Sequence, residues 1–127
     1  MDPSHYLLIG FAALIVILMV AKRLRQAPTA KVRELLAQNA LVIDVRSSDE
    51  FARDHVKGAV NLPLEQVQRR IGSIEPDHQR PILVHCLSGS RSAMACRILR
   101  GLGYSDVHNL GSLGRARRQG PFSERSG

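Results

Sequence analysis

The sequence predicts an α/β fold in which a parallel sheet of about four or five strands is flanked by helices and preceded by one apolar amino-terminal helix. Short runs of apolar and β-branched residues, such as 41–45 and 82–84, are typical of strands buried on both faces of a parallel sheet. Segments with helical spacing separate these runs, and this alternation favours right-handed crossovers. A chain of 127 residues has room for one such domain and an appendage.

Composition divides the chain into five parts. We expect a short tail at residues 1–5, a transmembrane helix at 6–22 and a basic linker at 23–28. A globular domain is expected at 29–114 and a basic, disordered tail at 115–127. The net charge of +7 lies mostly beyond residue 28. No aromatic stacking platform accompanies it, so we expect no nucleic-acid partner.

Residues 7–21 contain no polar side chain, and this apolar run predicts a membrane anchor. Positive charge follows this run, whereas a signal peptide carries its charge before the run. These fifteen residues span about 22 Å as a helix, less than the roughly 30 Å of a hydrocarbon core. Tyr6 at one interface and snorkelling Lys22 and Arg23 at the other reduce the difference. A buried helix of the globular domain is the alternative.

The positive-inside rule sets the expected orientation. Lys22, Arg23 and Arg25 follow the apolar run, so the domain behind them is expected on the cytoplasmic side, with the amino terminus outside. The chain is then a single-pass protein of a bacterial inner membrane. The tail arginines 115, 117 and 118 would also suit anionic lipids, although a solvated tail fits equally well.

The first half of the domain is predicted to alternate two short helices with two strands. Thr29 suits the N-cap of the first helix, which needs the sheet for its stability. Ser47 or Ser48 suits the N-cap of the second helix, whose first turn carries carboxylates as the helix dipole prefers. We expect helices over 30–38 and 49–52 and strands over 41–45 and 58–61.

The second half is predicted to continue the same alternation. Pro63 lies where the first turn of a helix tolerates proline, and Leu64, Val67 and Ile71 give that helix an apolar face. Gly101 is a usual stop after the last turn of the next helix. We expect helices over 64–74 and 92–100 and strands over 82–84 and 107–110.

Cys86 lies between a predicted strand and a predicted helix, the position at which open α/β sheets bind ligands. Free N–H groups at the helix start and the positive end of its dipole stabilise an anion, so the pKa of Cys86 is expected to be low. Arg91 adds a permanent cation that can bind an anionic substrate. The residues expected to hold the substrate are Leu87, Ser88, Gly89, Ser90, Arg91 and Ser92. A small buried hydrophobic residue is the alternative role for Cys86.

The loop Cys86-Leu87-Ser88-Gly89-Ser90-Arg91, followed by a serine, resembles the active-site loop of the rhodanese (sulfurtransferase) family. Segments 43–47, 50–51 and 55–63 resemble other recurrent segments of that family, in the same order. The resemblance covers about residues 29 to 111 and implies a persulfide on the cysteine. Two features depart from it: Leu87 stands where many relatives carry arginine, and the tail lacks their glycine pair and tryptophan.

The length of the loop separates two chemistries. Related phosphatases place five residues between cysteine and arginine, whereas Cys86 and Arg91 are separated by four, which suits a smaller target such as a persulfide sulfur. The sequence therefore predicts a membrane-anchored sulfurtransferase that moves sulfur from thiosulfate, a persulfide or a polysulfide to a thiol or cyanide, with no cofactor or metal. Leu87 favours persulfide or polysulfide over dianionic thiosulfate. A non-catalytic sulfur carrier or binding module is the alternative, and a cysteine-dependent phosphatase is a further one.

Asp44 and Arg46 end the first buried strand, at the edge of the sheet where Cys86 emerges. In the resembling family these positions help to shape the site, and a structural ion pair without a role in turnover is an equal alternative. Structural roles are expected for His55, His85 and Cys96. Two cysteines without metal-ligand spacing predict neither a disulfide framework nor a metal site.

Overall fold

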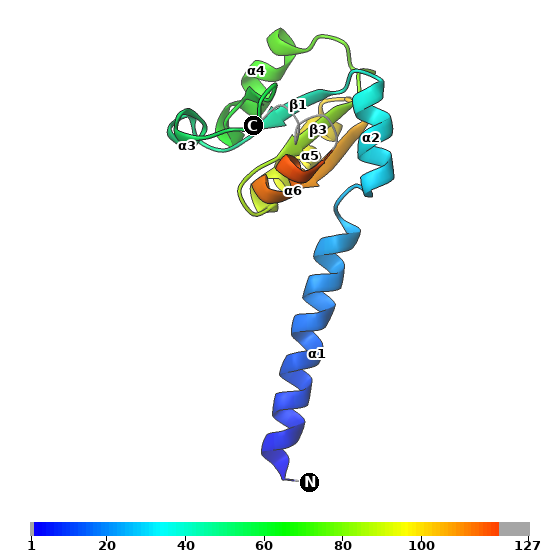
Figure 1. Cartoon of the computed structure of the whole chain (residues 1–127), viewed down its shortest axis with the longest axis vertical. Coiled ribbons are helices and arrows are strands. Elements are labelled where there is room, and N and C mark those ends of the chain that lie inside the picture. Colours follow the sequence, from blue (N-terminus) through cyan, green and yellow to red (C-terminus); the bar gives the residue numbers. More distant parts are fainter. Residues whose placement is uncertain (1, 120–127) are drawn as a thin grey trace.

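A computed structural model describes residues 2–119 and contains a four-stranded parallel sheet in the order β2-β1-β3-β4 (Figure 1). The strands are β1 (Leu41–Asp44), β2 (Val60–Asn61), β3 (Ile82–His85) and β4 (Val107–Gly111). The helices are α1 (Pro3–Leu24), α2 (Thr29–Ala37), α3 (Ser48–Arg53), α4 (Val67–Ile74), α5 (Ser90–Gly101) and α6 (Leu113–Arg118), with a 3-10 turn, η1 (Leu64–Gln66), before α4. The predicted α/β fold with a parallel sheet and a long apolar amino-terminal helix is confirmed.

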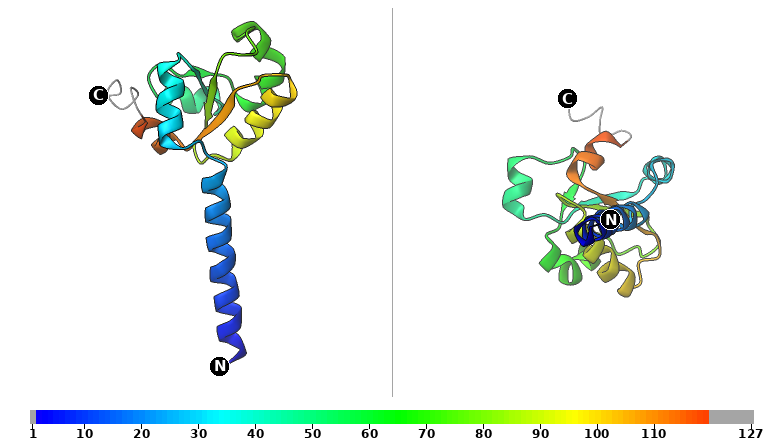
Figure 2. Two further views of the ribbon diagram at one scale, coloured as in Figure 1. Left: turned by 90° about the vertical axis from the view of Figure 1, so that its right-hand side faces the viewer. Right: turned by 90° about the horizontal axis from the view of Figure 1, so that it is seen from below.

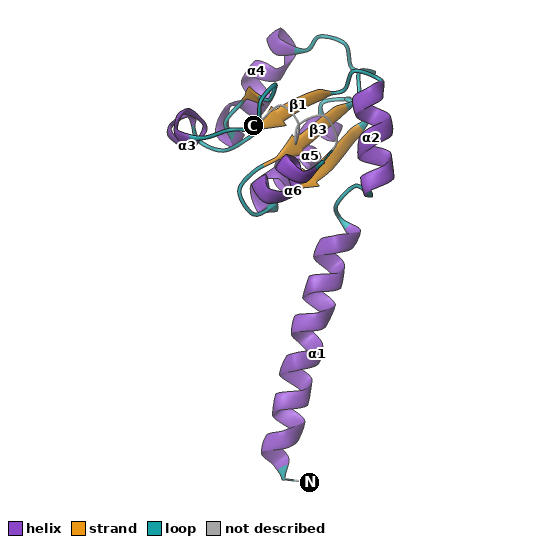
Figure 3. Cartoon of the chain, viewed as in Figure 1, coloured by secondary structure: helices purple, strands orange, loops and turns teal. Residues whose placement is uncertain are grey.

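Helices cover both faces of the sheet (Figure 3). Alternate strand residues point to opposite faces, so Ile43 and Val84 join one apolar cluster, with α4 and α5, while Val42 and Leu83 join another, with α2 and α6. All four strand side chains are at least 97% buried. Burial on both faces explains why β1 and β3 are apolar without interruption.

Several element bounds differ from the sequence prediction. The N-cap of α2 is Pro28 rather than Thr29, and the predicted strand 58–61 is reduced to β2. The predicted helix 64–74 begins as the 3-10 turn η1, and α5 begins at Ser90, two residues earlier than expected. The cap of α3 is as expected, because Ser47 Oγ accepts a hydrogen bond from Glu50 N at 3.2 Å.

Helix α1 extends away from the rest of the chain (Figure 2). Its 22 residues, none of them buried, correspond to a length of about 33 Å. It is the one helix within residues 2–119 that is long and apolar enough to cross a membrane, with a mean hydropathy of 2.3 in its most apolar part. The helix begins before and ends after the predicted span 6–22, so it is longer than the apolar run, and its last turn contains Lys22 and Arg23.

The short linker after α1 is docked on the sheet rather than free. Ala27 is 93% buried, its N–H donates to Asn109 O at 2.9 Å, and the guanidinium of Arg115 donates to Ala27 O. The side chain of Gln26 fills the space next to Gly111, where a Cβ atom would lie only 2.6 Å from Gln26 Nε2. These contacts fix the end of α1 beside the carboxyl edge of the sheet.

The prediction that the chain is disordered from residue 115 is wrong for residues 115–119. Helix α6 begins at Leu113 with Ser112 as its N-cap, whose Oγ accepts from Arg115 N at 3.1 Å, and Ala116 is fully buried. Arg117 pairs with Asp54. The helix forms because Leu113 and Ala116, three residues apart, pack against the sheet together with α2. The rest of the predicted disordered tail, 120–127, lies outside the described residues.

Candidate active site

The side chain of Cys86 is fully buried at the end of β3, inside the turn that leads to α5. Its backbone N–H donates to Gly111 O at 3.0 Å, which continues the pairing of β3 with β4 beyond the register shift after Val84. The N–H of Gly89 donates to Cys86 Sγ at 2.9 Å, so the turn closes directly on the sulfur atom. This closure requires a positive φ of 102° at Gly89, a conformation that L side chains rarely adopt.

Ser92 Oγ links the sulfur atom to the neighbouring strand. It lies 3.6 Å from Cys86 Sγ, 2.9 Å from Gly89 O and 2.7 Å from Asn109 Oδ1. A hydroxyl has one proton and two lone pairs, so it accepts from a thiol and donates to a thiolate. Ser92 can therefore serve both protonation states of Cys86 by rotating its O–H bond.

The surroundings of Cys86 favour its charged form. Burial by itself raises the pKa of the thiol, but hydrogen bonds from the Ser92 hydroxyl and from the backbone N–H groups of Ser92, Gly89 and Ser88 outweigh burial, and the pKa is lowered. The second cysteine shows the contrast, because burial raises the pKa of Cys96 to about 11. The loop thus lowers the pKa of one buried cysteine, whereas burial raises the pKa of the other, and the role of Cys86 as a nucleophile stays a prediction.

Arg91 is held in a bidentate ion pair with Glu50, at 2.7 Å from Nη1 to Oε1 and 3.0 Å from Nη2 to Oε2. The hydrogen bond from Arg91 lowers the pKa of Glu50 to about 2. Glu50 also caps its own helix, since its Oε1 accepts from Ser47 N at 3.2 Å. From the sequence, Glu50 was expected in the first turn of a helix and in a segment that resembles the family, but its contact with Arg91, 41 residues away, was not predicted.

Asp44 and Arg46 form a buried ion pair, with Arg46 Nη2 at 2.8 Å and Nε at 3.0 Å from Asp44 Oδ2. Arg46 Nη2 also donates to Asp54 O at 2.7 Å. These contacts tie β1 to the segment after α3 and favour the structural alternative, while a role in turnover stays a prediction. His85 Nε2 lies 4.0 Å from Asp44 Oδ2, and burial lowers the pKa of His85, which keeps the imidazole neutral.

The other two residues assigned structural roles differ in burial, because His55 is exposed and Cys96 is buried. His55 stacks on Phe51 at 3.8 Å between ring centroids, and its Nδ1 hydrogen-bonds with Phe51 O at 2.8 Å. Cys96 is buried among the side chains between the sheet and α5. Leu87, in contrast, is 54% exposed on the outside of the loop.

Comparison with known proteins decides the family. A sequence profile described as the rhodanese-like domain matches residues 28–113. The chain belongs to the rhodanese family.

Named relatives and a solved structure agree with this assignment. The chain is 41% identical over 71 residues to thiosulfate sulfurtransferase PspE of Escherichia coli K12, covering 56% of this chain and 68% of PspE. It is 34% identical over 74 residues to thiosulfate sulfurtransferase GlpE of Shewanella oneidensis, covering 58% of this chain and 71% of GlpE. A structure described as rhodanese with anions from E. coli has a TM-score of 0.58 at 38% identity and covers 60% of this chain and 89% of that one. These names bear out the prediction of a rhodanese-type enzyme.

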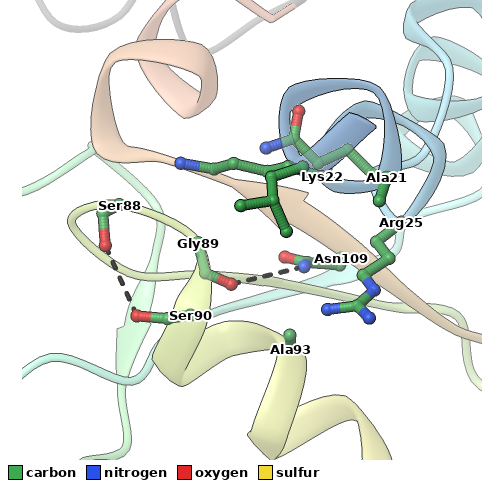
Figure 4. Close-up of a pocket in the computed structure, with 10 residues that line it drawn as sticks. Ala21, Lys22, Arg25, Ser88, Gly89, Ser90, Ala93 and Asn109 are labelled. Carbon is green, nitrogen blue, oxygen red and sulfur yellow. Dashed lines mark hydrogen bonds between the residues drawn. The ribbon is translucent and has the colours of Figure 1, made fainter. Parts of the chain in front are cut away.

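The rhodanese loop faces the end of α1 in this chain. Figure 4 shows Ser88, Gly89 and Ser90 opposite Lys22 and Arg25. A cavity of about 290 Å³ lies between the two elements. The basic linker and the loop lie in separate parts of the sequence, and no local pattern predicts that they meet.

Proposed function

We propose that this protein is a membrane-anchored sulfurtransferase that moves sulfane sulfur from thiosulfate, a persulfide or a polysulfide to a thiol or cyanide through a persulfide on Cys86. The observation that carries this proposal is the closed loop around Cys86 Sγ, in which Gly89 N donates at 2.9 Å and the pKa of the thiol is lowered. A buried thiolate surrounded by donors is both nucleophilic and selective for small targets.

The first half-reaction forms a sulfur–sulfur bond on the enzyme. Cys86 thiolate attacks the outer sulfur of the donor, and the donor's own S–S bond breaks. With thiosulfate, the bonding electron pair leaves on sulfite, and the enzyme keeps a Cys86 persulfide with one negative charge. The loop N–H groups that stabilise the thiolate then stabilise the terminal sulfur of the persulfide.

The second half-reaction restores the enzyme. A thiolate or cyanide attacks the terminal sulfur, the S–S bond breaks, and its electron pair returns to Cys86 as thiolate. No external oxidant or reductant is consumed. Two separate half-reactions at one nucleophile should give ping-pong kinetics. Arg91, at the start of α5, is proposed to orient the anionic donor.

Helix α1 is proposed to anchor the domain on the cytoplasmic side of a bacterial inner membrane. Its length of about 33 Å suits a hydrocarbon core, and it has no buried residue. Lys22 and Arg23 lie in its last turn, at the end joined to the domain, as the positive-inside rule requires for a cytoplasmic domain.

Intact-mass measurement of the full chain in detergent, before and after thiosulfate or polysulfide, tests the chemistry. We expect a gain of one sulfur atom that cyanide removes, and no gain in Cys86→Ser. Cys96→Ser is the matched control and should behave as the parent chain, because the pKa of Cys96 is raised to about 11. Persulfide formation that survives in Cys86→Ser would refute the proposal.

A non-catalytic sulfur carrier remains the second candidate, because the side chain of Cys86 has no exposed area and Arg91 is occupied by Glu50. A carrier would accept one sulfur atom and release it slowly. Steady-state formation of thiocyanate distinguishes the two functions: sustained turnover supports the enzyme, and a single stoichiometric transfer supports the carrier. Hydrolysis of an aryl phosphate would instead support the cysteine phosphatase.

A further inference from the structure

Two cavities lie near the carboxyl end of α1, and Figure 4 shows the residues that line the first of them, between α1 and the active-site loop. The first, of about 290 Å³, has Lys22 and Arg25 on one wall and the hydroxyl-bearing Ser88 and Ser90 on the other. The second, of about 320 Å³, continues along α5. Arg25, Ala93 and Asn109 line both cavities, which are therefore neighbours and are together called the recess below.

The recess is strongly positive. Arg25, Arg97 and Arg100 line its second part, and Lys22 lies in its first part. No aspartate or glutamate lines either cavity, and within residues 2–119 none of these four cations forms a salt bridge. Arg100 donates to Val107 O at 2.8 Å, a neutral acceptor that leaves the charge uncompensated. Four cations without an acidic partner around the recess attract an anion.

The recess is also amphipathic along the axis of α1. Leu18 and Ala21 line the side nearer the apolar part of the helix, whereas the cations and serine hydroxyls line the side nearer the domain. Lys22 begins the basic end of the helix, which in a membrane lies at the level of the lipid headgroups. A phosphodiester attached to acyl chains matches both sides, and free phosphate matches only the polar side.

We propose that this recess binds the phosphate group of an anionic phospholipid, with the first part of an acyl chain against Leu18 and Ala21. The inference rests on the proposed anchoring by α1 and adds a specific ligand to it. Basic pockets beside membrane helices on the cytoplasmic side recognise headgroups in this way, through charge and hydrogen-bond donors together.

A lipid in the recess would hold the active-site loop against the bilayer surface. The lipid phosphate would lie between α1 and the loop residues Ser88 and Ser90, so one molecule would contact both. The docked linker, with Ala27 N bonded to Asn109 O, already fixes the domain beside the end of α1. The donor and acceptor would then reach Cys86 from the interfacial layer of the membrane.

The test is lipid binding to the full chain in neutral detergent, measured by native mass spectrometry during titration with phosphatidylglycerol or phosphatidylcholine. We expect retained phosphatidylglycerol and little phosphatidylcholine. The double variant Arg25→Gln/Arg97→Gln should weaken phosphatidylglycerol binding by about thirty-fold, because each cation near an anionic headgroup contributes a factor of about five. Arg33→Gln/Arg69→Gln removes the same charge from exposed positions on α2 and α4 and should bind as the parent chain does.

Each other outcome overturns the proposal in a defined way. An equal loss of phosphatidylglycerol binding in the two double variants would mean that the net charge of the protein attracts the lipid. Equal retention of phosphatidylglycerol and phosphatidylcholine would mean that the headgroup is not recognised. Displacement of phosphatidylglycerol by millimolar inorganic phosphate would mean a site for a small anion. Membrane integration is measured separately by carbonate extraction and persulfide formation by intact mass, so failure of the anchor or of the sulfur chemistry is distinguished from failure of the lipid site.

Discussion

The Ser92→Ala variant tests the origin of the low pKa of Cys86. The Ser92 hydroxyl is, after burial, the largest influence on that pKa, and it acts in the opposite direction to burial. A hydrogen bond to a charged group contributes about 1.5–3 kcal/mol, and one pKa unit corresponds to about 1.4 kcal/mol. Loss of the hydroxyl should therefore raise the pKa of Cys86 by about one to two units.

The fold should tolerate this change. In Ser92→Ala, Asn109 Oδ1 keeps the hydrogen bond from Gly111 N at 2.9 Å, and Gly89 O keeps the one from Ala93 N at 3.1 Å. No buried acceptor is left without a partner, so we expect a loss of stability of about 1 kcal/mol or less. A change in reactivity then reports on the thiolate and not on unfolding.

The assay is the rate of Cys86 alkylation by iodoacetamide as a function of pH, read by peptide mass mapping so that Cys96 is counted separately. Since only the thiolate reacts, the midpoint of the profile should move to higher pH in Ser92→Ala, and the rate below the midpoint should fall by about ten- to hundredfold. Ser90→Ala is the matched control, because within residues 2–119 the one hydrogen bond of Ser90 Oγ is with Ser88 Oγ, at 3.4 Å. An unchanged midpoint in Ser92→Ala, or equal shifts in both variants, would refute the reasoning.

Three further predictions concern the loop, its ion pair and the core. Gly89→Ala should lower the free energy of unfolding, measured by chemical denaturation, by about 1–3 kcal/mol and should slow persulfide formation, because φ at this position is 102°. An unchanged free energy of unfolding would contradict this prediction. Glu50→Gln should lower the KM for thiosulfate several-fold by releasing Arg91 from the ion pair, and a higher KM would show that Glu50 instead positions Arg91 for the donor. Leu83→Ala should cost about 2–5 kcal/mol in the free energy of unfolding, whereas Leu87→Ala, at an exposed position, should cost less than about 0.5 kcal/mol.

The parts of the molecule that follow from local patterns were predictable from the sequence. The strand before Cys86, the glycine in the loop and the helix after it are neighbours in the chain, so propensity and position predict their arrangement. The buried strands β1 and β3 were clear for the same reason, since each is an uninterrupted apolar run. The family resemblance then supplied the chemistry.

The parts that depend on distant contacts were not predictable in this way. The pairing of Arg91 with Glu50 joins residues 41 positions apart, and the docking of Ala27 on Asn109 joins the linker to the last strand. Helix α6 was missed because basic residues dominate its composition, although Ser112 as an N-cap and the spacing of Leu113 and Ala116 were local signals for it.

The burial of Cys96 has a consequence for the lifetime of the proposed persulfide on Cys86. The chain has two cysteines, and the second is a thiol whose pKa is raised to about 11. A persulfide on Cys86 therefore has no internal partner that would turn it into a disulfide and discard the sulfur as sulfide. The proposed persulfide should then persist until an acceptor encounters it, so that the abundance of acceptor thiols or cyanide sets how long each sulfur atom is kept.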